Sequence, residues 1–335
     1  VFPHRLQAQA VLRRALELRP EDARARYYLG NLLCAKDRPE EALALWEQAA
    51  PKLQGFSVVH RNIGRARWKV KEEPDAAIRA YEQALAADPN DYKLYFELNR
   101  ILAACGLRER QDRLIQSIPP ALLENDVIAE LVAAHHIDAG RFDEALQILT
   151  SVRFYPWEVY KGVRLLYVDA NVGKGIVLLG EGRFAEAADS FRRVFEYPRN
   201  IGVGESTNRA NAEALCRSGL ALEAAGDHGE ARRQWRLAVE EPRPAPSDLS
   251  YYRALALQRL GEDREAASVL TQLIDLARDN IARLQPDTAG SLYLSGLGHK
   301  GLGQTAQGRQ DFTIALTLKR DHRRCRWQLD GFDPH

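Results

Sequence analysis

The chain has 335 residues, of which 47 are basic and 46 acidic, so its formal net charge is only +1. This length exceeds one ordinary hydrophobic core and predicts either two domains or a repeat array. Hydrophobic residues make up 45% and charged residues 28%, which is typical of a soluble folded protein. No apolar run approaches the roughly 18 residues of a membrane span. The balanced charge disfavours a nucleic-acid binder. We therefore expect neither membrane nor nucleic acid as a partner.

The four cysteines are far apart in the sequence and form no CxxC pair: Cys34, Cys105, Cys216 and Cys325. This spacing predicts neither a zinc site nor a disulfide framework, and it fits a reducing, cytoplasmic compartment.

Pairs of small residues recur along the whole chain. In six of seven cases the two small residues are 12 apart, and a large residue and another apolar residue follow the second one. The seven pairs are Gly30 and Ala42, Gly64 and Ala77, Ala133 and Ala145, Gly175 and Ala187, Gly219 and Ala231, Ala254 and Ala266, and Gly296 and Gly308. Small residues let two antiparallel helices approach closely, and the large residue fills the space between them. The pattern predicts consecutive helix pairs.

This pattern resembles the tetratricopeptide repeat, which has a period of about 34 residues and a proline near the end of each unit. Prolines fall near that closing position at Pro20, Pro51, Pro89, Pro119, Pro156, Pro198 and Pro242. The resemblance implies an all-α, right-handed α-solenoid of about eight to nine tetratricopeptide-type helix pairs, some joined by long inserts.

We expect a single superhelix over residues 1–335. Its first unit, 1–20, is truncated, and a degenerate unit lies at 90–120 with Asn99 and Gln111 at the small positions. Three connections are longer than the rest, and they place inserts near 154–162, 197–205 and 277–285.

Two of these inserts carry a more specific resemblance. Pro156-Trp157-Glu158, then Tyr197-Pro198-x-Asn200-Ile201-Gly202, resemble the repeat region of the bacterial domain-of-unknown-function 5107 family. In that family the repeats follow a sugar-mutarotase-like β-sandwich, so the resemblance implies that this chain is part of a larger bacterial protein. Trp157, Glu158, Tyr197 and Asn200 would then be candidates to contact a sugar.

No motif for a nucleophile, a phosphate-binding loop, a zinc protease or a dinucleotide is present. The adjacent His135 and His136 would point about 100° apart on a helix and cannot face one metal. We therefore expect no catalytic residue, no metal and no cofactor.

In a tetratricopeptide array the first helix of each pair lines the concave groove. Counting from the small positions predicts a basic and aromatic N-terminal groove of Arg24, Tyr27, Asn31, Arg61, Arg65, Trp68, Lys93, Phe96 and Arg100, with no carboxylate in it. The same count in later units selects acidic and apolar residues, among them Asp169, Ile176, Leu179, Glu213 and Cys216.

Two interpretations of the basic groove remain open. Arginines and an asparagine could hold the carboxylate of a bound peptide, or they could line a solvated face and pair with neighbours such as Glu97. The leading hypothesis is a non-catalytic scaffold that binds an acidic or carboxylate-bearing segment of a protein, or another domain of its parent chain. A carbohydrate-associated protein with its site around Trp157 and Asn200 is the alternative. A purely structural homodimer, paired through Val11 and Leu12, is a third hypothesis.

Overall fold

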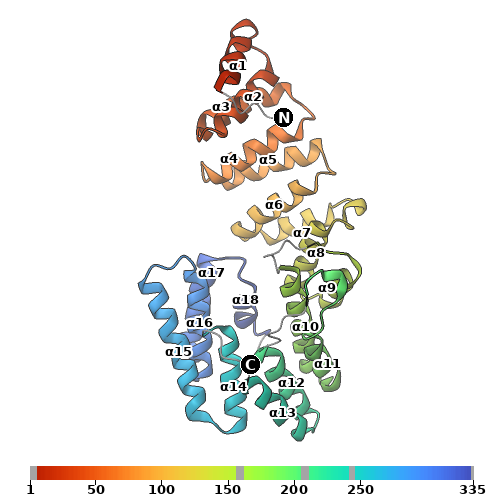
Figure 1. Cartoon of the computed structure of the whole chain (residues 1–335), viewed down its shortest axis with the longest axis vertical. Coiled ribbons are helices and arrows are strands. Elements are labelled where there is room, and N and C mark those ends of the chain that lie inside the picture. Colours follow the sequence, from red (N-terminus) through yellow and green to blue (C-terminus); the bar gives the residue numbers. More distant parts are fainter. Residues whose placement is uncertain (1–5, 156–161, 205–210, 241–245, 333–335) are drawn as a thin grey trace. The chain divides into compact units, whose positions relative to one another are not determined.

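The computed structural model describes residues 6–155, 162–204, 211–240 and 246–332. Within these ranges the protein is entirely helical, with eighteen α-helices, three short 3₁₀ turns and no strand (Figure 1). Trp157 and Glu158, two of the insert residues predicted to contact a sugar, lie outside the described residues.

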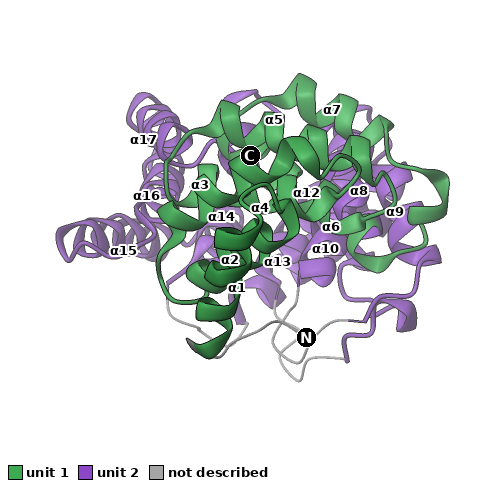
Figure 2. Ribbon diagram, turned by 90° about the horizontal axis from the view of Figure 1, so that it is seen from above, with its two compact units in different colours: residues 1–128 green, residues 129–335 purple. Residues whose placement is uncertain are grey.

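The chain forms two compact units, residues 1–128 and 129–335, coloured green and purple in Figure 2. Unit 1 contains α1 (Leu6–Leu18), α2 (Ala23–Cys34), α3 (Pro39–Ala49), α4 (Ser57–Lys69), α5 (Pro74–Ala87), α6 (Tyr92–Cys105) and α7 (Arg108–Gln116). The 3₁₀ turns η1 (Ala50–Lys52) and η2 (Pro120–Leu122) follow α3 and α7.

Helix α8 (Asp126–Asp138) starts just before the boundary and continues into unit 2. The remaining elements of unit 2 are α9 (Phe142–Ser151), α10 (Gly162–Gly180), α11 (Phe184–Arg193), η3 (Arg199–Ile201), α12 (Ala212–Ala224), α13 (His228–Glu240), α14 (Asp248–Leu260), α15 (Asp263–Ala282), α16 (Thr288–Gly301), α17 (Thr305–Leu318) and α18 (Arg323–Leu329).

The helices pair as the sequence pattern predicts. Each pair of small residues falls on two consecutive helices, from α2 and α3 to α16 and α17, and the degenerate unit of Asn99 and Gln111 is α6 and α7. The described part of the chain thus has eight helix pairs, with α1 before them and α18 after them. The predicted third insert, 277–285, is largely helical, because α15 continues to Ala282.

Glycine and an aromatic ring interlock within five of the pairs. A Cβ atom added at Gly30 would lie 2.6 Å from the indole of Trp46, and one added at Gly64 would lie 2.7 Å from the ring of Tyr81. The same contact joins Gly175 to Phe191, Gly219 to Trp235 and Gly296 to Phe312. Only glycine lets the two backbones approach this closely, which explains the recurring pattern physically.

The two predicted sugar-contacting residues that the structure describes hold an insert in place. The side-chain amide of Asn200 donates hydrogen bonds to the carbonyl oxygens of Leu149 and Val152, at 2.8 and 2.7 Å, and the backbone carbonyl of Asn200 accepts one from the Phe154 N–H. The guanidinium of Arg164 lies 4.3 Å from the centre of the Tyr197 ring. These contacts fasten the residues around η3 to the end of α9.

None of the described helices combines the length and apolarity that a membrane span requires. Nor do the described histidine, cysteine and acidic residues form any group of three or more that could hold a metal ion.

Candidate functional site: a basic pocket in unit 1

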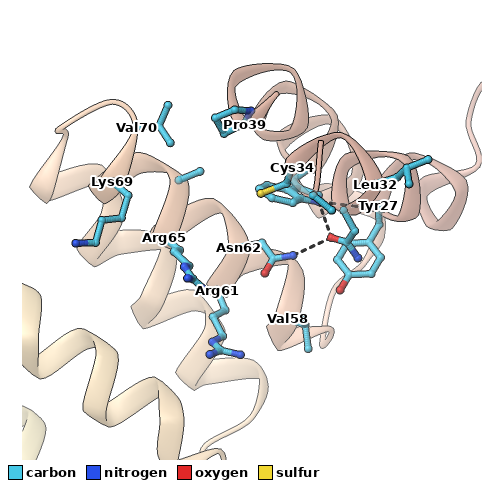
Figure 3. Close-up of a pocket in the computed structure, with 14 residues that line it drawn as sticks. Tyr27, Leu32, Cys34, Pro39, Val58, Arg61, Asn62, Arg65, Lys69 and Val70 are labelled. Atoms are coloured by element: carbon cyan, nitrogen blue, oxygen red, sulfur yellow. Dashed lines mark hydrogen bonds between the residues drawn. The ribbon is translucent and has the colours of Figure 1, made fainter. Parts of the chain in front are cut away.

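A pocket of about 630 Å³ lies between α2, α3 and α4. Figure 3 shows Arg61, Arg65 and Lys69 in a row along α4, with Tyr27, Leu32 and Cys34 of α2 on the other wall. The volume falls within the range of roughly 300–1,000 Å³ that is usual for ligand sites. Side chains one helical turn apart share one face of a helix, which is why residues 61, 65 and 69 point the same way.

Two asparagines connect the walls of this pocket. The Asn31 Oδ1 atom accepts hydrogen bonds from Asn62 Nδ2, at 3.0 Å, and from the indole N–H of Trp46, at 3.1 Å (Figure 3). The Asn31 Nδ2 atom is buried and has no acceptor among the described residues. A buried donor without a partner costs about 1–3 kcal/mol.

Arg61 is held by a carboxylate. Its Nε donates to Glu97 Oε2 at 2.8 Å, its second nitrogen pairs with Oε1, and the Tyr81 hydroxyl donates to the same carboxylate at 2.9 Å. The hydrogen bond to Glu97 raises the pKa of Arg61. Burial opposes ionisation of Glu97, but the hydrogen bonds from Arg61 and Tyr81 outweigh it and lower the pKa of the carboxyl.

Arg65 and Lys69 differ from Arg61. Both are exposed, and neither makes a hydrogen bond or ion pair with any residue that the structure describes. Because neither cation forms an ion pair with a described carboxylate, they give this pocket its positive charge.

The structure gathers four of the nine predicted groove residues in this pocket: Tyr27, Asn31, Arg61 and Arg65. The other five do not line it. Arg24 is exposed on α2 and Trp68 is half-buried on α4. On α6, Lys93 lies 5.8 Å from the centre of the Tyr92 ring, and Arg100 lies at the same distance from the Phe96 ring.

Sequence reasoning missed two residues of this region, Asn62 and Lys69. Glu97 was expected as a neighbour that could pair with the cations, and it does pair with Arg61. Glu97 corrects the expectation of a groove without carboxylates, because it binds Arg61 from α6. The i, i+4 spacing of Arg61, Arg65 and Lys69 was the available signal for Lys69. Counting from the small position of each repeat, which selected the other groove residues, does not select Lys69.

Three family models described as "Tetratricopeptide repeat" match the chain, over residues 6–61, over 62–106 with 133–201, and over 248–279. Together they cover more than half of the sequence. The chain is a tetratricopeptide-repeat protein, and the predicted fold class, an α-solenoid of tetratricopeptide-type helix pairs, is confirmed.

Solved structures of similar fold have low sequence identity to this chain. The Naa15/Naa10 complex bound to HypK-THB contains a chain that is 14% identical, with a TM-score of 0.49; the match covers 97% of this chain and 62% of that one. A tetratricopeptide repeat protein from Parabacteroides merdae is 15% identical, with a TM-score of 0.44; the match covers 83% of this chain and 98% of that one. YrrB, described as a TPR protein with an unusual peptide-binding site, is 18% identical, with a TM-score of 0.32; the match covers 76% of this chain and 99% of that one.

Proposed function

We propose that this protein is a non-catalytic scaffold that binds an acidic, carboxylate-bearing segment of a partner protein in the pocket of unit 1. The observation that carries the proposal is that a pocket with apolar walls is also lined by two exposed cations, Arg65 and Lys69, which form no ion pair with a described residue. Tetratricopeptide-repeat proteins typically act as protein-interaction scaffolds, which agrees with this role.

The chemistry of the pocket fits an extended peptide with alternating side chains. Tyr27, Leu32, Val58 and Val70 provide apolar surface, whereas Arg65 and Lys69 supply charge at one side. A hydrogen bond to a charged group contributes about 1.5–3 kcal/mol. Two such contacts are enough for a tenfold or larger difference in affinity.

The test uses fluorescent decapeptides in which Glu alternates with Leu or Tyr, each with a free or an amidated C-terminus. Their affinity is measured by anisotropy for the unmodified chain and for the Arg65→Glu/Lys69→Glu variant. We expect at least tenfold weaker binding to the variant. Arg61 is left intact, because its reversal would break its ion pair with Glu97, the carboxylate to which Tyr81 also donates.

A matched control reverses two exposed arginines that do not line the pocket, in an Arg13→Glu/Arg79→Glu variant. This variant has the same net charge as the pocket variant and should bind the peptides as the unmodified chain does. An equal loss in both variants would show that only overall charge matters. Absence of binding to the unmodified chain would also refute the proposal.

The carbohydrate hypothesis and the resemblance to the domain-of-unknown-function 5107 family stay predictions, as does the homodimer. In the structure the Asn200 amide is engaged by two backbone carbonyls and the Tyr197 ring by Arg164. The described part of that insert therefore supports the peptide-binding proposal over the sugar-binding one.

A further inference from the structure

The last helix, α18, packs on α17 as the first helix of a further pair would, and its arginine side chains also reach the inner helices of unit 2 (Figure 1). It has seven residues and follows α17 after a connection of only four residues, 319–322. Its side chains reach α8, α10 and α12, which precede it by more than a hundred residues. These three helices are the first members of consecutive pairs.

The arginines of α18 bind three carboxylates, Asp138, Asp169 and Glu213, and Arg324 also acts electrostatically on a fourth, Asp248. These four carboxylates are here named the acidic face. Arg323 binds Asp138 at 2.6 Å and Asp169 at 2.8 Å. Arg324 binds Asp169 at 2.7 Å and Glu213 at 2.8 Å, and Arg326 binds Asp138 at 2.9 Å. Arg217 of α12 adds a contact of 3.1 Å to Glu213.

These contacts determine how the carboxylates ionise. Burial opposes the charge on Asp169, but Arg324 and Arg323 outweigh it and lower the pKa of that carboxyl. Asp248 at the start of α14 is less well compensated: burial, together with the nearby Glu213 and Asp169, raises its pKa despite Arg324. Without α18 the carboxylates would repel one another across the acidic face.

Two apolar anchors fix the register of α18. Trp327 is 7% exposed and packs edge-on to Phe142, with ring centres 6.1 Å apart. Cys325 is fully buried, in a hydrophobic cluster that includes Tyr252 and Tyr293. Past the end of α18, Phe332 lines a pocket of about 370 Å³ with Ile176, Leu179 and Arg217. The segment thus leaves unfilled space at its C-terminal end.

The contacts of these arginines across the acidic face are of the kind that a bound basic peptide makes. A seven-residue helix is not stable by itself in water. Buried ion pairs contribute specificity more than stability, because desolvation offsets their attraction. Asp169 and Glu213 also occupy the groove positions that the sequence pattern assigns to ligand contact in α10 and α12.

We propose that the acidic face of unit 2 is a second protein-binding site, selective for a basic helix with two adjacent arginines and an aromatic residue three positions later. Helix α18 occupies this site as an intramolecular competitor. The partner's helix displaces α18 and makes the contacts that Arg323, Arg324 and Trp327 make in the closed protein. This site is separate in position and opposite in charge from the pocket of unit 1.

The first experiment measures the opening of α18 in the unmodified chain by alkylation of its cysteines, quantified by mass spectrometry. Cys325 on α18 and Cys216 on α12 are both fully buried. Burial raises the pKa of the Cys325 thiol to about 12, so the docked helix protects it. We expect Cys325 to react at least tenfold faster than Cys216, because α18 leaves while the rest of the unit stays folded. Equal rates would overturn the proposal, since α18 would then open only when the unit unfolds.

The second experiment tests the vacated site with a fluorescent peptide of residues 319–332 carrying Cys325→Ser. A short tether gives α18 an effective concentration on the order of millimolar, so the peptide should compete poorly in the unmodified chain. The full chain with Arg323→Ala/Arg324→Ala should bind the peptide at least tenfold more tightly than the unmodified chain does.

Two controls make the result specific. A peptide with Arg323→Glu/Arg324→Glu should not bind, and adding Asp169→Asn/Glu213→Gln to the variant chain should abolish binding of the original peptide. Equal affinity of the unmodified and variant chains for the peptide would contradict the proposal. So would a variant chain in which Cys216 becomes as reactive as Cys325, because α18 would then be an integral part of the core.

Discussion

At the residue scale, the difference between Arg61 and Arg65 decides what the unit 1 pocket can bind. Both lie on one face of α4, yet Glu97 and Tyr81 hold Arg61, whereas no described residue pairs with Arg65. A guanidinium already in bidentate contact with a carboxylate has little to offer a ligand, while an exposed one keeps its donors available. We therefore expect Arg61 to have a structural role in this pocket and Arg65 to be the arginine that contacts a ligand.

The Arg61–Glu97 contact predicts a pH-dependent stability. Replacing Glu97 with Gln should lower the free energy of unfolding at pH 7 by about 1–3 kcal/mol, because it leaves a half-buried arginine without its carboxylate. The pKa of Glu97 is lowered in the folded protein from an ordinary value of 4.5. The advantage of the native carboxylate is thus present above pH 4.5 and lost as the pH falls through the folded pKa.

Urea denaturation at several pH values between 7 and 3 measures this difference. Glu109→Gln on α7 is the matched control, because Glu109 is exposed in the same unit and should have little effect at any pH. A difference between the Glu97→Gln variant and the native chain that stays constant down to pH 3 would show that the carboxylate charge is not its cause.

At the element scale, the helix pairs are stabilised by the close approach of glycine and an aromatic ring. At Gly64 an added Cβ would meet the Tyr81 ring at 2.7 Å and the Ala77 carbonyl oxygen at 3.2 Å. Tyr81 cannot turn aside freely, because its hydroxyl is hydrogen-bonded to Glu97. Gly64→Ala should therefore lower the free energy of unfolding of unit 1 by about 1–3 kcal/mol, the usual cost of overpacking.

The control is an alanine at Gly229, which lies exposed in helix α13 with no contact closer than 3.8 Å to an added Cβ. Alanine is the better helix former by about 1 kcal/mol, so Gly229→Ala should stabilise the protein. Thermal unfolding followed by circular dichroism compares the two variants. Opposite signs are expected, and a neutral or stabilising Gly64→Ala would contradict the interlocking contact.

The sequence predicts the helix pairs because the interactions that define them are local. The small residue and its aromatic partner, such as Gly30 and Trp46, lie within one repeat, so their spacing is visible in the chain itself. The partner of Arg61 comes from α6, 36 residues away, and its identity depends on how the next pair packs. The contact of Arg323 with Asp138 spans 185 residues, and no periodicity encodes it.

At the scale of the whole molecule, the two compact units differ in how their charged residues are partnered. Unit 1 presents exposed cations at its pocket, and unit 2 holds carboxylates that α18 covers. The near-zero net charge of the chain does not reveal this local arrangement of charges. Composition alone therefore argues against charged ligands, whereas the exposed cations of unit 1 favour an acidic one. Each unit would select a different class of protein segment.

The division into two units also predicts two unfolding transitions. In repeat proteins stability is the sum of local terms and neighbour contacts, so a destabilised unit can unfold before the other. Gly64→Ala and Gly219→Ala place the same substitution in unit 1 and in unit 2, where a Cβ would meet the Tyr81 ring at 2.7 Å and the Trp235 indole at 2.2 Å, respectively. In urea denaturation followed by circular dichroism, each variant should lower the midpoint of a different transition. A single transition that both variants shift equally would mean that the units unfold as one body, as a continuous superhelix would require.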